Sequence, residues 1–185
     1  MHWEKLKNNL FCFQDSCQVY AVRGPTGTVL VNAGTGRCAT YLNEITDNNS
    51  LTVILTHHFR DHTDGALRLH AAGAQIFGPY WDQEYLIDPE QHFGERQVWN
   101  SYDNRWDRFS PVRAQPVSGW MMDYEQREIA GLTWEVVPTP GATNGANIGA
   151  TARASVAEEA VRMRLIYAGG VGGVNHGPDE GSSLQ

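Results

Sequence analysis

Three side chains that could bind a metal lie within six residues of one another in the segment THHFRDHTDG, residues 56–65: His57, Asp61 and His62. Imidazole nitrogens and a carboxylate are ligands that zinc and related metals prefer. A bound metal can turn water into a nucleophile near neutral pH, so the segment suggests a metal-dependent hydrolase. The same residue types also suit a turn in which His57 and Asp61 hydrogen-bond to the backbone, and the segment alone leaves both interpretations open.

A buried strand and a helix are expected to flank this segment. Residues Leu51–Leu55 form a continuous apolar run, which is typical of a strand buried on both faces. Residues Gly65–Ala72 carry apolar side chains at helical spacing. Ligands and catalytic groups collect where strands of α/β proteins end. We therefore expect the three side chains at one end of the central strand, in a cleft formed by loops from both halves of the chain.

The other expected elements are mostly short strands. A GPTG turn at residues 24–27 separates two strands and predicts an antiparallel hairpin near the start of the chain. Helical spacing recurs at Ala39–Ile45 and Trp81–Ile87. The remaining strands are expected at Leu10–Phe13, Gln18–Arg23, Thr28–Asn32, Ala74–Phe77, Gln126–Ile129, Leu132–Val137, Ala146–Ala150 and Arg164–Ala168. This order predicts one α/β domain, residues 1–185, with helices outside two packed sheets.

Composition and charge restrict the class of partner. Of the 185 residues, 41% are hydrophobic and 19% charged, which is the balance of a packed globular protein. A formal net charge of −7 argues against nucleic-acid binding, which needs Lys and Arg to neutralise phosphates. No apolar run approaches the ~18 residues of a membrane span. We therefore expect neither a nucleic-acid partner nor a membrane, but a small-molecule substrate or ligand; oligomeric state stays open.

The cysteines and the first residues indicate the compartment. Cys12, Cys17 and Cys38 lack the C-x-x-C spacing of zinc and redox sites, and are expected to be core or half-buried thiols, although a Cys12–Cys17 bridge is conceivable. The first nine residues have no apolar signal-peptide core. We therefore expect a cytoplasmic protein.

The segment at residues 57–62 resembles the H-x-H-x-D-H signature of the metallo-β-lactamase superfamily. His57, Asp61 and His62 match the first, third and fourth ligand positions, whereas the second position holds Phe59, which cannot bind a metal. His58, His70 and His92 have no spacing that favours ligation, and most of them are expected to be surface or turn histidines; His176 lies in a Gly-rich tail and is not expected to be recruited as a ligand.

The resemblance extends over nearly the whole chain. Residues 29–34 read VLVNAG where the family often ends a strand in Asp-Thr-Gly, and residues 138–141 read PTPG where it has a Pro-Gly turn. Residues 165–170 read LIYAGG and resemble a family strand that ends in Gly-Asp. The resemblance implies a metallo-β-lactamase-like αβ/βα sandwich with a shortened C-terminal end.

Two further ligand positions depart from the family pattern. The family's Pro-Gly is followed by a metal-binding His and its Gly-Asp supplies an Asp that bridges two metals, whereas the aligned residues here are Ala142 and Gly170. The last family His would lie beyond residue 185. The resemblance thus implies at most one weakly bound zinc ion, held by His57, Asp61 and His62, with Asp61 placing or deprotonating a water.

Two functional hypotheses follow from this depleted ligand set. The first and favoured one is a domain that keeps the scaffold but is catalytically weak or inactive, a pseudoenzyme or binding module. The alternative is a zinc hydrolase of an ester, lactone, thioester or β-lactam that uses one residual metal. Ligand count separates them, because a catalytic zinc usually has three protein ligands and an open position for water.

Overall fold

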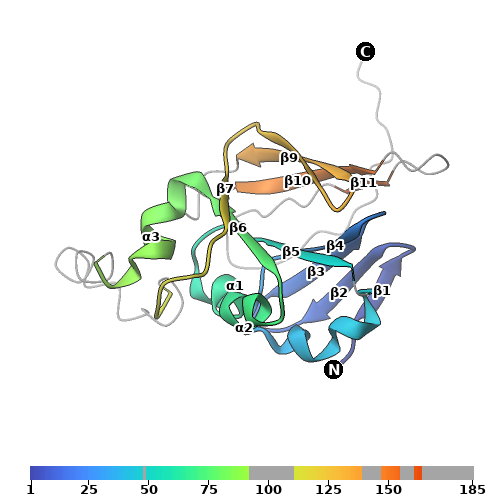
Figure 1. The fold of residues 1–185 in the computed structure, drawn as a ribbon, viewed down its shortest axis with the longest axis horizontal. Coiled ribbons are helices and arrows are strands. Elements are labelled where there is room, and N and C mark those ends of the chain that lie inside the picture. Colours follow the sequence, from blue (N-terminus) through green and yellow to red (C-terminus); the bar gives the residue numbers. More distant parts are fainter. Residues whose placement is uncertain (48, 92–110, 139–146, 155–160, 164–185) are drawn as a thin grey trace, which may run out of the picture.

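Two β-sheets and several short helices make up the chain in the computed structural model, which describes residues 1–47, 49–91, 111–138, 147–154 and 161–163 (Figure 1). The elements, in chain order, are β1 (Glu4–Lys7), β2 (Leu10–Gln14), β3 (Gln18–Arg23), β4 (Gly27–Val31), 3-10 helix η1 (Arg37–Glu44), β5 (Ser50–Ile54), α1 (Arg60–Thr63), α2 (Ala66–Ala71), β6 (Gln75–Pro79), 3-10 helix η2 (Tyr80–Asp82), α3 (Gln83–Ile87), β7 (Gly119–Met121), β8 (Gln126–Ile129), β9 (Leu132–Pro138), β10 (Asn147–Ala154) and β11 (Val161–Met163). No helix in these ranges is long and apolar enough to cross a membrane.

The larger sheet contains seven strands in the order β1 to β7. Its first four strands pair antiparallel, and β4, β5, β6 and β7 pair parallel. Parallel neighbours need a crossover, which η1 supplies between β4 and β5, and α1 with α2 between β5 and β6. The smaller sheet is antiparallel, in the order β11-β10-β9-β8. The parallel strands all end at one edge of the larger sheet, and that edge carries the site described below.

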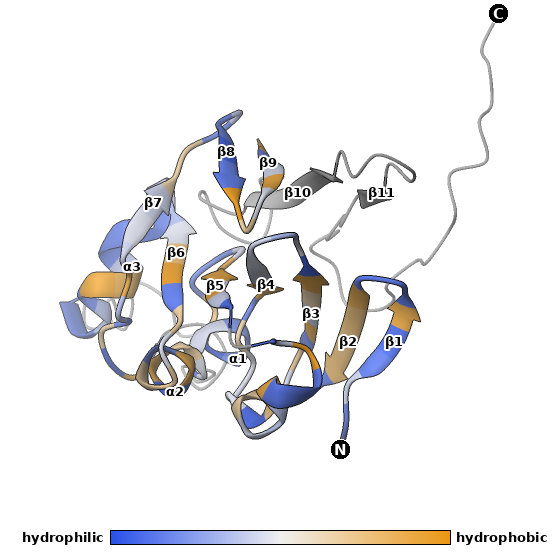
Figure 2. Ribbon diagram, turned by 45° about the vertical axis from the view of Figure 1, so that its right-hand side comes forward, coloured by the Kyte–Doolittle hydropathy of each residue, from blue (hydrophilic) through white to orange (hydrophobic). Residues whose placement is uncertain are grey.

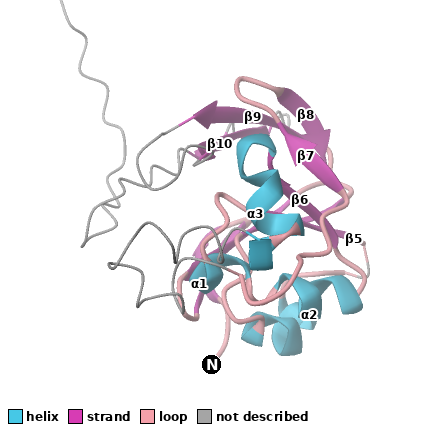
Figure 3. Cartoon of the chain, turned by 90° about the vertical axis from the view of Figure 1, so that its left-hand side faces the viewer, coloured by secondary structure: helices cyan, strands magenta, loops and turns pink. Residues whose placement is uncertain are grey.

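The helices lie on one face of the larger sheet and the smaller sheet on the other, so its central strands are covered on both faces (Figures 1 and 3). One face packs against the helices in a cluster that includes Cys38, Leu69 and Leu86. The other face packs against the smaller sheet, whose Leu132 and Trp134 are almost fully buried. The two sheets and the helices are therefore three successive layers: the predicted sandwich of two packed sheets is confirmed, and the described helices lie outside the larger sheet.

Alternating side chains on β3 show why this layering follows from the sequence. Val19 and Ala21 belong to the helix-facing cluster, whereas Tyr20 and Val22 belong to the cluster between the sheets. Successive residues of a strand point to opposite faces, so an uninterrupted apolar strand must be covered on both sides. Figure 2 shows hydrophobic colours along β2 and β3 and mostly hydrophilic ones along β8.

Most predicted elements are confirmed, with three kinds of difference. The predicted helix 39–45 is the 3-10 helix η1, interrupted by non-helical backbone at Tyr41. Strand β1 was not predicted because all four of its residues are exposed and give no apolar period. Strand β7 was not predicted either, because it is only three residues long. Strand β11 was missed too, and the strand predicted at Arg164–Ala168 lies outside the described residues.

Candidate functional site

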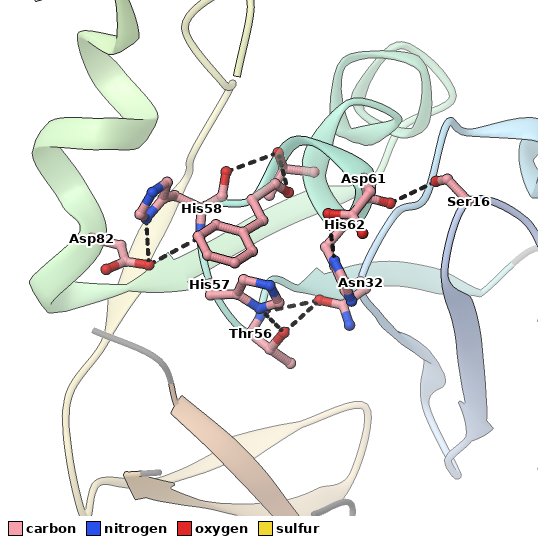
Figure 4. A network of polar contacts seen from close by, with 10 residues as sticks. Ser16, Asn32, Thr56, His57, His58, Asp61, His62 and Asp82 are labelled. Atoms are coloured by element: carbon pink, nitrogen blue, oxygen red, sulfur yellow. Dashed lines mark hydrogen bonds and ion pairs between the residues drawn. The ribbon is translucent and has the colours of Figure 1, made fainter. Parts of the chain in front are cut away.

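Polar side chains gather at the carboxyl ends of three parallel strands (Figure 4). Asn32 directly follows β4, residues 56–58 follow β5, and Asp82 lies in η2, which follows β6. Adjacent parallel strands deliver the residues after them to the same edge of the sheet, and ligand sites of open α/β sheets lie there. This edge is the candidate site.

The structure brings together the three residues that the sequence singles out. The ring centroids of His57 and His62 are 4.3 Å apart, and Nδ1 of His62 donates a hydrogen bond of 2.9 Å to Oδ1 of Asp61. His57 and His62 are buried, whereas the Asp61 side chain is 38% exposed. Helix α1 begins at Arg60, six residues after β5 ends at Ile54, and this short connection keeps the three side chains adjacent.

Phe59 packs against imidazole rings. Its ring centroid lies 4.7 Å from that of His57 and 5.2 Å from that of His58, both edge-on. The position aligned with the second ligand of the signature therefore places a phenyl ring against His57. Ala142, aligned with the next missing ligand, lies outside the described residues, as do Gly170, His92 and His176.

His58 and Asp82 form a buried pair that the sequence analysis missed. Oδ2 of Asp82 accepts hydrogen bonds from the backbone N–H of His58 at 2.9 Å and from its Nδ1 at 3.0 Å. Asp82 is fully buried and His58 is 3% exposed. His58 therefore lies in the turn after β5, one of the two expected placements, but it is not at the surface: its ring is buried, and Asp82 supplies the acceptor that the ring needs. His70 is exposed, as expected.

Asn32 connects to His57 through Thr56. Oδ1 of Asn32 accepts from the backbone N–H of Thr56 at 3.1 Å and from its hydroxyl at 2.9 Å. The same hydroxyl lies 2.8 Å from Nδ1 of His57. Asn32 has a positive φ of 66°, which Asn tolerates better than most residues. The sequence does contain a signal for Asn32 and Asp82, since each follows an apolar strand of the parallel set within three residues.

Backbone hydrogen bonds join α1 and Gly65 to the loop after β4 and hold the residues of the site in place relative to that loop. The backbone N–H of Ala33 donates to the carbonyl of His62 at 2.8 Å, and that of Gly65 to the carbonyl of Gly34, also at 2.8 Å. A Cβ atom at Gly65 would lie 2.2 Å from the backbone nitrogen of Gly36, so only glycine allows this approach. Ser16 adds a hydrogen bond of 2.6 Å from its hydroxyl to the carbonyl of Asp61.

Burial makes His57 a neutral imidazole at physiological pH. Loss of hydration lowers the pKa of His57 well below its usual 6.5, and the neighbouring His62 and His58 lower it further. The three cysteines are free thiols, and burial raises the pKa of Cys12 to about 11 and that of Cys38 to about 12. None of these thiols is therefore a ready nucleophile.

The lowered pKa of His57 predicts a pH-dependent stability. The unfolded chain binds a proton at this histidine at a higher pH than the folded chain, so the free energy of unfolding should fall as pH decreases through the usual histidine range, from about 7 to about 5. We expect His57→Gln to reduce this fall, measured by urea unfolding at both pH values. The exposed His70→Gln is the matched control, and equal falls in all three proteins would contradict the assignment.

The described donors do not by themselves fit a zinc ion. Within the described ranges, no three His, Cys, Asp or Glu side chains are grouped so that they could hold a metal. Nδ1 of His62 is bound to Asp61 and Nδ1 of His58 to Asp82, so these two rings could bind a metal only through Nε2. The chemistry of the donors suits zinc, but their arrangement in this part of the chain does not complete a site.

Solved structures share this architecture. The chain is similar to the native FEZ-1 metallo-β-lactamase from Legionella gormanii, with a TM-score of 0.62, 17% identity, and coverage of 80% of this chain and 56% of that one. It is also similar to BJP-1, a subclass B3 metallo-β-lactamase of Bradyrhizobium japonicum, with a TM-score of 0.59, 17% identity, and coverage of 80% and 55%. A metallo-β-lactamase family protein from Thermus thermophilus matches with a TM-score of 0.55, 21% identity, and coverage of 78% and 56%.

Sequence comparison adds no relative: no family model and no curated protein matches the chain. The chain spans about 56% of the length of the solved structures that it matches. At 17–21% identity the likeness concerns the arrangement of strands and helices, and it agrees with the strand order and layers described above. The chain therefore has the metallo-β-lactamase fold.

Proposed function

We propose that this chain is a metallo-β-lactamase-like domain with a depleted metal site, and that it hydrolyses substrates weakly or not at all. The observation that carries the proposal is the position of Phe59, whose ring packs 4.7 Å from that of His57 where the signature has its second histidine. A phenyl ring supplies no ligand atom and makes the surroundings of His57 less polar.

The hydrogen bonds around the site support the same proposal. His58 is held by the buried Asp82, so it is placed as a structural imidazole beside Phe59. Asp61 accepts from His62, which gives this carboxylate a protein partner. These contacts stabilise the turn after β5 through side chains, because His57 contacts the Thr56 hydroxyl and Asp61 the His62 ring, whereas the turn interpretation expected bonds to the backbone.

A second candidate function is a hydrolase with one weakly held zinc ion, acting on an ester, lactone, thioester or β-lactam. The observation in its favour is the 4.3 Å separation of the His57 and His62 rings, with Asp61 adjacent. It ranks below the first candidate because a catalytic zinc usually has three protein ligands, and the described donors are not so grouped.

Zinc content and turnover separate the two candidates. We expect the chain, purified without chelator, to hold well below one zinc ion per molecule. We also expect no chelator-sensitive turnover of a chromogenic β-lactam, a lactone or a thioester, because polarising a carbonyl and activating water both depend on a held metal. Mass spectrometric metal analysis and spectrophotometric assays give the two measurements.

Two variants make the result specific to the site. His57→Gln should leave the low zinc content unchanged, as should the exposed control His70→Gln. Near-stoichiometric zinc that His57→Gln removes and His70→Gln keeps, together with chelator-sensitive turnover, would overturn the first candidate and establish the second.

A further inference from the structure

We infer that Asn32 and Thr56 are positioning residues that hold His57 in the tautomer with the proton on Nδ1. The inference goes beyond the proposed function, because it concerns the chain of hydrogen bonds from Asn32 through Thr56 to His57, called the relay below, and this chain of bonds needs no metal. It rests on the contacts that link the ends of β4 and β5 in Figure 4.

The direction of each hydrogen bond follows from the number of protons available. Oδ1 of Asn32 accepts the backbone N–H of Thr56 at 3.1 Å, which places the carbonyl of the amide on that side, because its NH₂ group cannot accept. The Thr56 hydroxyl, 2.9 Å from the same oxygen, must then donate to it. A hydroxyl has one proton, so toward Nδ1 of His57, 2.8 Å away, it can only accept.

His57 therefore donates from Nδ1, and Nε2 carries its lone pair. A protein commonly sets the identity of the reactive imidazole nitrogen through the hydrogen bond that the other nitrogen makes. Nε2 is thus the atom through which His57 would accept a proton or bind an ion.

The hydrogen-bond partner of His57 differs in charge from the partners of the two neighbouring histidines. His58 and His62 each donate from Nδ1 to a carboxylate, that of Asp82 and that of Asp61. His57 donates instead to the neutral hydroxyl of Thr56, which in turn donates to the neutral amide of Asn32. A carboxylate would favour the imidazolium form, whereas this relay fixes the tautomer without adding a negative charge.

The tautomer is visible by nuclear magnetic resonance. The full chain is labelled with ¹⁵N-histidine, treated with chelator, and recorded in a long-range ¹H–¹⁵N correlation at about pH 7.5, where a neutral histidine dominates. The His57 signals are assigned by their loss in His57→Gln. We expect the nitrogen that couples to both carbon-bound ring protons, Nε2, to show the chemical shift of an unprotonated nitrogen.

Variants of Thr56 and Asn32 test whether their hydrogen bonds set the tautomer of His57. Thr56→Ser keeps the hydroxyl and should keep this pattern, whereas Thr56→Val removes it and should shift the signal of Nε2 toward the protonated range. If Thr56→Val does not fold, Asn32→Asp and Asn32→Gly give the same contrast, since glycine tolerates the positive φ but supplies no acceptor. A protonated Nε2 in the unmodified chain, or identical patterns in the hydroxyl-keeping and hydroxyl-removing variants, would overturn the inference.

Discussion

Replacing Trp134 with alanine is expected to lower the free energy of unfolding by about 3–5 kcal/mol. Trp134 lies on β9, has no exposed surface, and is part of the cluster between the two sheets. Its removal leaves a large cavity and also deletes the hydrogen bond of 3.2 Å from its indole N–H to the carbonyl of Ile129. Urea unfolding followed by circular dichroism measures the loss.

Trp81 offers a matched control. Its indole N–H also donates a hydrogen bond of 3.2 Å, to the carboxylate of Asp123, but 56% of its surface is exposed. Trp81→Ala should therefore cost about 1 kcal/mol or less. If Trp134→Ala does not fold, Trp134→Phe should still cost more than Trp81→Phe. Equal losses at the two positions would mean that the smaller sheet does not pack on the larger one as described.

Much of the fold was predictable because the larger sheet is buried on both faces. The run Val29–Val31 is apolar throughout and Leu51–Leu55 is apolar except for Thr52, as expected of strands covered on both sides. The pairing of the strands was harder to predict from the sequence. A strand such as β1, exposed along its length, is stabilised by backbone hydrogen bonds to β2, which leave no pattern in the side chains.

The site was predictable in part for a related reason. His57, Asp61 and His62 are close in sequence, so one turn after one strand suffices to bring them together. Asn32 and Asp82 come from other strands and are 24 residues from their partners Thr56 and His58. Only the parallel order of β4, β5 and β6 places them at the same edge, and that order is a property of the folded sheet.

The histidine contacts also explain why residue type alone could not assign roles. His58 and His57 are adjacent and both buried, yet one pairs with a carboxylate and the other with a hydroxyl. His58 contacts Asp82, which follows β6, whereas His57 contacts the hydroxyl of Thr56, which is bound to Asn32 after β4. The chemistry of each histidine is therefore set by the partner that the fold places beside it.

Introducing two histidines should restore zinc binding. Phe59→His combined with Ala142→His would place imidazoles at two positions where the signature has ligands of the same metal as His57. Three histidines with an open position form a common catalytic zinc site. Since the loss of one supporting partner commonly costs about 10–100-fold in affinity, we expect the double variant to bind zinc at least ~100-fold more tightly than the unmodified chain. Competition with a chromophoric chelator measures the affinity.

The controls separate ligation from a change in polarity or packing. Phe59→Gln with Ala142→Gln removes the same side chains and adds polar groups without imidazole, so it should show no comparable gain. Adding His57→Gln to the double histidine variant should remove most of the gain, because the third ligand is then missing. Phe59→His alone should give an intermediate affinity, since the Phe59 ring already contacts that of His57. Equal zinc affinity in the histidine and glutamine double variants would contradict the alignment of positions 59 and 142 with the lost ligands.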